Sequence, residues 1–163
     1  MKKRFLSVVS SLVMIGMMLT VNLTHVEASE TGVKKVDGSY LTSEDSSSGK
    51  STDKLRGKYL MTGDCTISKA GRGRVYAYAS TTANQEVNYM ATLVYVERYM
   101  EDVDAWGQVD WWVVEAQDEY FLSTAKTIYV DGGYYYRVRA NHIAGDEYPY
   151  EETASVTNGI WVN

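Results

Sequence analysis

The chain has 163 residues, a formal net charge of −5, one cysteine and two histidines. This length suits one domain with its own core, and a single cysteine excludes a disulfide framework. An acidic chain without a basic stripe also argues against binding to nucleic acid or to anionic membrane surfaces.

The first 28 residues have the pattern of a cleavable secretory signal peptide. Three basic residues open the chain after Met1, and an apolar or small run follows from Phe5 to Val21. The triplet Val26-Glu27-Ala28 supplies the small residues that signal peptidase requires. We therefore predict cleavage after Ala28 and an extracellular protein without a membrane span. An uncleaved membrane anchor is the alternative, because the apolar run is at the lower limit for crossing a hydrocarbon core of ~30 Å.

Residues 29–55 differ in composition from the rest of the chain. They are rich in Ser, Thr, Gly, Lys and Asp and contain few apolar side chains. A segment of this kind cannot bury enough apolar surface to offset its loss of conformational entropy. We predict a flexible spacer here, or alternatively a propeptide, followed by a compact domain over 56–163.

From Arg56 onward, short runs alternate apolar and polar residues, with turn residues about every ten positions. No window shows helical periodicity. This pattern predicts an all-β domain, an immunoglobulin/fibronectin-III-like antiparallel β-sandwich of about seven strands. The expected strands are Tyr59–Ser68, Arg74–Ser80, Val87–Met100, Gln108–Glu115, Phe121–Val130, Tyr134–Ile143 and Glu152–Val162, the last broken near Asn158-Gly159.

Two resemblances add to this prediction. In residues 127–145, an Asp-Gly-Gly turn leads into a tyrosine-bearing strand that continues Arg-Val-Arg-Ala, which resembles the penultimate hairpin of fibronectin type III modules. Nearly all of 56–163 is similar to an uncharacterised family of small secreted proteins from Gram-positive bacteria. The motifs that carry this likeness are Lys58-Tyr-Leu-Met61, Tyr95-Val-Glu-Arg98, Gly133-Tyr-Tyr-Tyr-Arg-Val138 and Thr157-Asn-Gly-Ile-Trp161. It implies a secreted β-sandwich and no particular activity.

The residues that could carry catalysis are few. After cleavage His142 is the sole histidine, and we predict a hydrogen-bonded structural role for it because no turn presents a serine to it. Cys65 is expected to be a buried small hydrophobic residue, with an intermolecular disulfide as the alternative. One Cys and one His cannot supply a usual zinc site, and the acidic loops at 101–104 and 146–152 lack the spacing of a calcium loop. We predict no catalytic residues, no metal, no cofactor and no enzymatic activity.

Aromatic side chains are the remaining feature. Tyr76 and Tyr78 alternate with small residues and Tyr135 alternates with arginines, so these rings should face outward. Exposed rings suit contacts with a glycan or a protein, whereas cross-strand pairing within a sheet face is the simpler interpretation. Stacking of Arg137 and Arg139 on these rings, or ion pairs of the two arginines with Glu97 or Glu115, would likewise be structural. The candidate binding residues are Tyr76, Tyr78, Trp106, Trp111, Tyr135 and Arg137.

The hypothesis that these patterns favour is a secreted, non-enzymatic β-sandwich that binds an extracellular protein or glycan. The alternative, from another class, is a secreted toxin or antimicrobial effector that acts on competing cells.

Overall fold

The computed structural model describes residues 33–51 and 57–163 as two packed β-sheets, with no helix in these two ranges. The strands are β1 (Lys35–Val36), β2 (Ser39–Thr42), β3 (Ser46–Lys50), β4 (Leu60–Lys69), β5 (Arg74–Val87), β6 (Tyr89–Met100), β7 (Ala105–Ala116), β8 (Glu119–Tyr129), β9 (Tyr134–Gly145), β10 (Glu151–Val156) and β11 (Gly159–Val162). The predicted all-β class and sandwich architecture are therefore confirmed. Within the described ranges no helix is long and apolar enough to cross a membrane.

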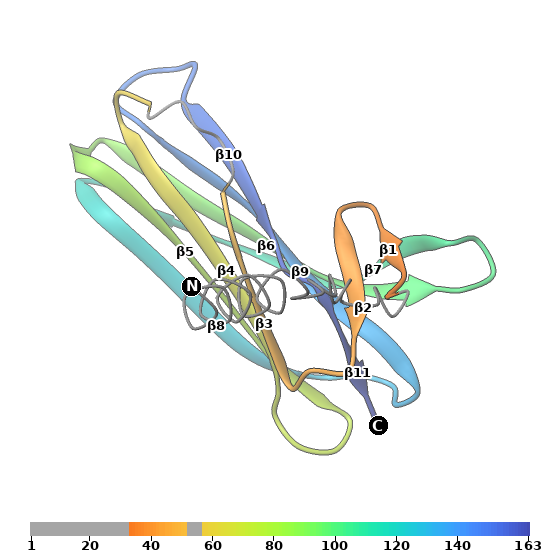
Figure 1. The fold of residues 1–163 in the computed structure, drawn as a ribbon. Coiled ribbons are helices and arrows are strands. Elements are labelled where there is room, and N and C mark those ends of the chain that lie inside the picture. The colour runs from red at the N-terminus through yellow and green to blue at the C-terminus, as the bar shows by residue number, and fades with distance from the viewer. Residues whose placement is uncertain (1–32, 52–56) are drawn as a thin grey trace, which may run out of the picture. The chain divides into compact units, whose positions relative to one another are not determined.

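The two sheets share the strands unequally. The larger sheet has the order β1-β2-β11-β9-β6-β7, with β10 also paired to β9, and the smaller sheet has the order β3-β4-β5-β8 (Figure 1). Only β2 and β11 run parallel among the described strand pairs, with Leu41 opposite Gly159 and Thr42 opposite Ile160. From β4 onward the chain changes sheet after β5, after β7 and after β8, so the connections join both layers into one sandwich.

Side-chain alternation builds the core between the sheets. In β5, Val75, Ala77 and Ala79 are fully buried, whereas Tyr76 and Tyr78 lie between them on the outer side. The main cluster contains Cys65, Ile67, Val75, Ala77, Ala79, Val94, Val96, Trp112, Tyr136, Val138, Ala140, Ile160 and Val162. A smaller apolar cluster forms around Met90.

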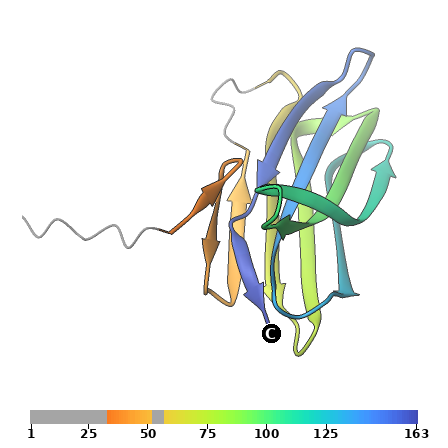
Figure 2. The same ribbon diagram turned by 90° about the vertical axis from the view of Figure 1, so that its right-hand side faces the viewer.

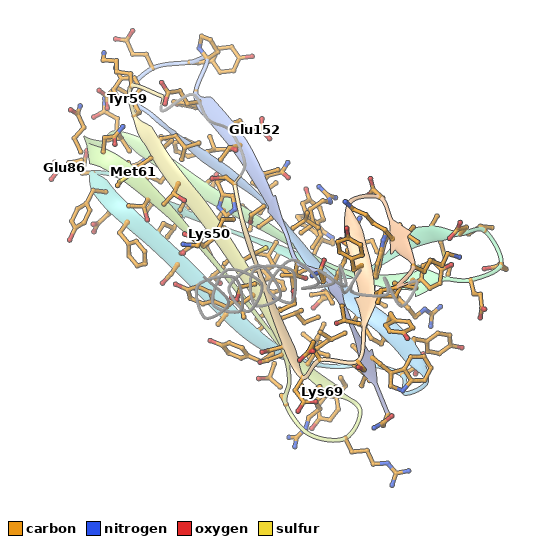
Figure 3. The ribbon with its side chains drawn as sticks, viewed as in Figure 1. Lys50, Tyr59, Met61, Lys69, Glu86 and Glu152 are labelled. Carbon is orange, nitrogen blue, oxygen red and sulfur yellow. The ribbon has the colours of Figure 1, made fainter. Side chains whose placement is uncertain are left out.

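The seven strands predicted after Arg56 are all present, with different limits. Strand β5 continues to Val87, and β7 begins at Ala105. The final strand divides near Asn158, as expected, into β10 and β11. Figure 3 shows Tyr59, which precedes β4, and Lys69, its last residue, at opposite ends of that strand.

The prediction of a flexible spacer is wrong for residues 33–51. Strands β1 and β2 form a hairpin on the larger sheet beside β11 (Figure 2), and β3 pairs with β4. Ladder hydrogen bonds and a few buried side chains, Val36 and Ser39 among them, order this polar segment against a core supplied by the other strands. Residues 33–163 thus form one compact unit. Residues 29–32, 52–55 and the predicted signal peptide (1–28) lie outside the described residues.

Strands β7 and β8 are the outermost strands on one side of their sheets. Lys126 of β8 lies opposite the buried Ala77, in the register that faces the interior. Its ammonium group lies 4.5 Å from the centre of the Trp112 ring. The same ring donates a hydrogen bond from Nε1 to Thr124 Oγ1 at 3.0 Å. Lys126 is itself exposed, so its contact with Trp112 lies at the solvent edge of the core, between the two outer strands.

Candidate binding site

The aromatic residues predicted to bind a ligand do not form one surface. Tyr76 and Tyr78 lie on the outer side of β5 in the smaller sheet, where Tyr76 is 38% exposed. Trp111 is 53% exposed on β7 of the larger sheet, opposite Tyr95 of β6. Tyr135 belongs to a third place, at the start of β9. The structure therefore separates these rings into three locations.

Arg137 is a correction to the predicted site, because it is only 2% exposed. Its Nε donates to Glu97 at 2.7 Å, and its Nη2 lies 2.7 Å from an Asp37 carboxylate oxygen. Its Nη1 donates to the Asp37 carbonyl at 2.8 Å and to the Ser39 hydroxyl at 3.0 Å. The contact with Glu97 confirms the predicted ion pair. Because the β1–β2 hairpin covers the guanidinium group, Arg137 has a structural role and is not available to a ligand.

Trp106 belongs to the same structural cluster. The Arg137 guanidinium carbon lies 4.5 Å from the centre of the Trp106 ring, and Trp106 Nε1 donates to the Val36 carbonyl at 3.0 Å. The ring also packs against Tyr99 with centroids 5.7 Å apart. Trp106 therefore links the hairpin to β6 and packs against Tyr99, a residue that lines a neighbouring hollow.

Tyr135 lines that hollow, which has a volume of about 300 Å³. The lining residues are Lys34, Leu41, Tyr99, Glu101, Gly133, Tyr134, Tyr135 and Trp161. They come from the β1–β2 hairpin, the end of β6, the start of β9 and β11, four segments that pair within one sheet. This region lies away from the end of the sandwich where Tyr59, Glu86 and Glu152 are found (Figures 1 and 3).

Four aromatic rings form the walls of this hollow. Tyr135 and Trp161 meet edge to face, with centroids 4.9 Å apart and planes at 67°. Tyr134 is 42% exposed, whereas Tyr99 is only 6% exposed. A second hollow adjoins the first and shares Tyr99, Glu101 and Tyr134 with it. We call this four-ring hollow the aromatic hollow.

The charged groups around the aromatic hollow differ in whether they have an ion-pair partner. Lys34 Nζ lies 2.8 Å from Asp104 and donates to the Tyr99 hydroxyl at 2.6 Å. The hydrogen bonds to Asp104 and then to Tyr99 raise the pKa of Lys34, and the bond from Lys34 lowers the pKa of Asp104. Both groups are therefore ionised at neutral pH. Glu101 has no ion pair with any residue that the structure describes.

His142 lies fully buried between the sheets. Its Nδ1 is 2.9 Å from Thr81 Oγ1, and its Nε2 is 2.7 Å from Ser155 Oγ. Burial lowers its pKa to about 4, so the ring is neutral at pH 7. The predicted structural role of His142 agrees with this geometry, because both ring nitrogens are already hydrogen-bonded.

Cys65 is also completely buried, as predicted. Burial raises the pKa of its thiol to about 11, so the reactive thiolate is scarce at neutral pH. A buried thiol in this position does not reach a second chain while the domain is folded. The geometry therefore favours the buried hydrophobic role over an intermolecular disulfide.

The acidic loops serve the fold where the structure describes their contacts. Glu151 accepts hydrogen bonds from the backbone N–H groups of Lys58, Tyr59 and Leu60, at 2.7 to 2.9 Å. Burial alone would raise the pKa of Glu151, but these three donors outweigh it and lower the pKa. Over the described ranges, no three His, Cys, Asp or Glu side chains converge as metal ligands.

Sequence reasoning identified one residue of the aromatic hollow, Tyr135, and missed the others. Tyr134 and Trp161 stood within recognised motifs but had no assigned place, and Lys34 was placed in a spacer. The Asp37-Gly38 pair was the overlooked signal, because Asp-Gly between short strands is a strong mark of a tight hairpin. A hairpin there would have placed Lys34 in the domain.

Comparison with known proteins adds no relative to this description. No family model, no curated protein and no solved structure matches the chain.

Proposed function

We propose that this protein is an exported, non-enzymatic binding domain that holds part of an extracellular glycan or protein ligand in the aromatic hollow. The observation that carries the proposal is the convergence of Tyr99, Tyr134, Tyr135 and Trp161 around one concavity. Binding pockets combine apolar and aromatic walls with a few polar groups that fix orientation. Lys34 and Glu101 are such groups at this hollow.

The support for the aromatic hollow lies in its rigidity as well as its composition. Tyr135 and Trp161 pack against each other, and Tyr99 is fixed by Trp106 and by hydrogen bonds to Lys34 and Asp104. Rings that are already fixed lose little conformational entropy when a ligand arrives. The scattered rings of Tyr76, Tyr78 and Trp111 line neither the aromatic hollow nor the hollow that adjoins it.

The finer fold assignment is part of the same proposal, namely an immunoglobulin/fibronectin-III-like sandwich. In support, β4, β5 and β8 form one layer, while β7, β6, β9 and β10 form the other. Strands β4 to β10 can be counted in chain order as the first to seventh strands of such a sandwich. The first, second and fifth then form one layer and the other four form the second layer, with the fourth strand beside the third, as in one group of immunoglobulin-like sandwiches. The polar hairpin β1–β2 is an addition to this arrangement, and it contributes to the aromatic hollow.

A glycan array tests this function directly. The purified protein is applied to immobilised peptidoglycan fragments, teichoic acids and host glycans, and the strongest binder is measured again with Trp161→Ala. We expect that variant to lose affinity by at least about tenfold, because truncating an anchoring aromatic residue costs about 2 kcal/mol.

Tyr76→Ala is the matched control, since it removes an exposed ring from the other sheet. It should bind as the unchanged protein does. Loss of binding with Tyr76→Ala but not with Trp161→Ala would move the site to the smaller sheet. If no glycan binds, capture of extracellular proteins must show the same dependence on Trp161, or the proposed site fails.

A further inference from the structure

The aromatic hollow has an excess of negative charge at its edge. Each of its cations already has a carboxylate partner, since Lys34 pairs with Asp104 at 2.8 Å and Arg98 of the adjoining hollow pairs with Asp131 at 3.4 Å. Glu101 and Asp102 remain exposed and form no ion pair with a described residue. A neutral ligand would leave these two carboxylates uncompensated, whereas a cation would compensate them.

The rings of this region already hold cations from the protein itself. The Lys34 ammonium lies 5.1 Å from the centre of the Tyr99 ring, and the Arg98 guanidinium carbon lies 4.6 Å from the centre of the Tyr134 ring. In contrast, Tyr135 and Trp161 have no such cation over them among the described side chains. The attraction of a cation for a ring face is therefore realised twice here, whereas the half-buried rings of Tyr135 and Trp161, which also line the hollow, hold no cation from a described residue.

We propose that the aromatic hollow binds a quaternary ammonium group of the ligand, held on the faces of Tyr135 and Trp161 with Glu101 as the counter-charge. This inference rests on the proposed binding function and names the chemical class that enters the site.

The lining chemistry favours a quaternary over a primary ammonium. A primary ammonium carries three N–H donors that need acceptors when water is removed, whereas a quaternary ammonium carries none. The Tyr99 hydroxyl already accepts from Lys34 and donates to Asp104, and Trp161 Nε1 is a donor that is bonded to Asn163. The side-chain acceptors left in the lining for those three donors are the Glu101 carboxylate and the hydroxyls of Tyr134 and Tyr135. A volume of about 300 Å³ at the lower end of ligand pockets also suits a small head group.

Titration with choline chloride tests the proposal, with 3,3-dimethylbutan-1-ol as the uncharged analogue of the same shape. NaCl keeps the ionic strength constant, and binding is followed by the NMR shift of the Trp161 indole N–H. We expect choline to bind about tenfold more tightly than the alcohol, since cation–ring attraction supplies the difference. n-Butylammonium should bind more weakly than choline.

Glu101→Gln removes the counter-charge from an exposed side chain without a described ion pair, so the variant should keep its fold. We expect its affinity for choline to fall about threefold to tenfold, with no change for the alcohol. Trp111→Phe, on the outer side of β7, is the control and should change neither affinity. Circular dichroism verifies the fold of each variant.

Several results would overturn the ammonium proposal. They are equal binding of choline and the alcohol, tighter binding of n-butylammonium, an unchanged Glu101→Gln, or no shift of the Trp161 signal with choline. If a glycan or protein still binds in a manner that requires Trp161, the proposed function stands while the ammonium assignment fails. If binding on the array does not depend on Trp161 but choline binds as expected, the ammonium site stands and the proposed glycan or protein ligand is wrong.

Discussion

His142 is a fully buried titratable side chain, and its cross-strand partners are the threonines Thr92 and Thr153. Thr81 and Ser155 bond its two nitrogens, and Thr81 in turn lies 2.6 Å from Thr92 Oγ1. No side chain fits between the ring and the adjacent strand, because a Cβ on Gly63 would lie 2.1 Å from the imidazole. The site therefore accepts a neutral imidazole, and the fully buried ring would have to carry its charge out of contact with solvent as an imidazolium ion.

This placement predicts a loss of stability in mild acid. The unfolded chain protonates His142 below about pH 6.5, while the folded protein resists protonation until about pH 4. Between these values the unfolded state binds more protons, so the free energy of unfolding falls as pH falls. The total loss is on the order of 3 kcal/mol.

Urea unfolding at a series of pH values measures this effect, and His142→Gln provides the comparison because glutamine does not titrate. Carboxylates contribute equally to both proteins, so the difference between their slopes from pH 6.5 to pH 5 isolates the histidine. Identical slopes would contradict the assignment.

Arg137 shows which part of a site sequence patterns can predict. Its alternation with Tyr135 correctly placed it on the outer side of β9, and the pairing with Glu97 was also anticipated. Its burial was not, because the covering group is the β1–β2 hairpin, about 100 residues earlier in the chain. Alternation reports the face of a strand and contains no information about what later packs on that face.

At the scale of the element, the β1–β2 hairpin depends on its turn. Asp37 and Gly38 have φ values of 45° and 81°, both in the left-handed region that two-residue hairpin turns require. The space around a Gly38 side chain is open, since a Cβ there would meet no atom within 4 Å. Any cost of substitution at Gly38 therefore comes from the backbone conformation alone.

Gly38→Val should lower the free energy of unfolding by about 1–2 kcal/mol, because a side chain with a branched Cβ disfavours this backbone conformation. Gly38→Asn is the matched variant, since asparagine tolerates positive φ, and it should be nearly neutral. Chemical denaturation measures both. Equal losses for the two variants would show that the turn conformation is not the cause.

The strands after Arg56 were predictable because each has its own alternation and its own turn signals. The first three strands lack apolar alternation and take their order from partners, β3 from β4 and β2 from β11. The aromatic hollow could not be predicted from the sequence either. Its walls come from four segments that become neighbours only through the strand order of the larger sheet. Among its residues, only Tyr135 had a local pattern that drew attention to it.

At the scale of the whole molecule, residues 33–51 belong to the folding unit. A chain that begins at Arg56 would uncover Arg137 and Glu97, and it would leave one side of β4 without β3. Exposing a buried ion-pair cluster together with a strand edge should cost at least about 3 kcal/mol. We therefore expect the shortened chain to lose cooperative unfolding or to aggregate.

Thermal unfolding and size-exclusion chromatography compare this fragment with a chain that begins at Ser29. The longer chain should unfold cooperatively as a single species. A fragment that begins at Arg56 and melts at the same temperature as the longer chain would restore the idea of a dispensable spacer.

Lys126 is exposed at the open edge of β8 although its register faces the interior, and this position has a consequence for self-association. The outer strand β8 exposes Tyr120 and Phe121 and has no strand neighbour on its far side among the described residues, which are properties of a template for strand addition. A strand added there would extend the sandwich over Lys126 and trap its ammonium group in a dry interior. That penalty opposes edge-to-edge assembly of further copies, so it helps the protein to stay dispersed at high concentration.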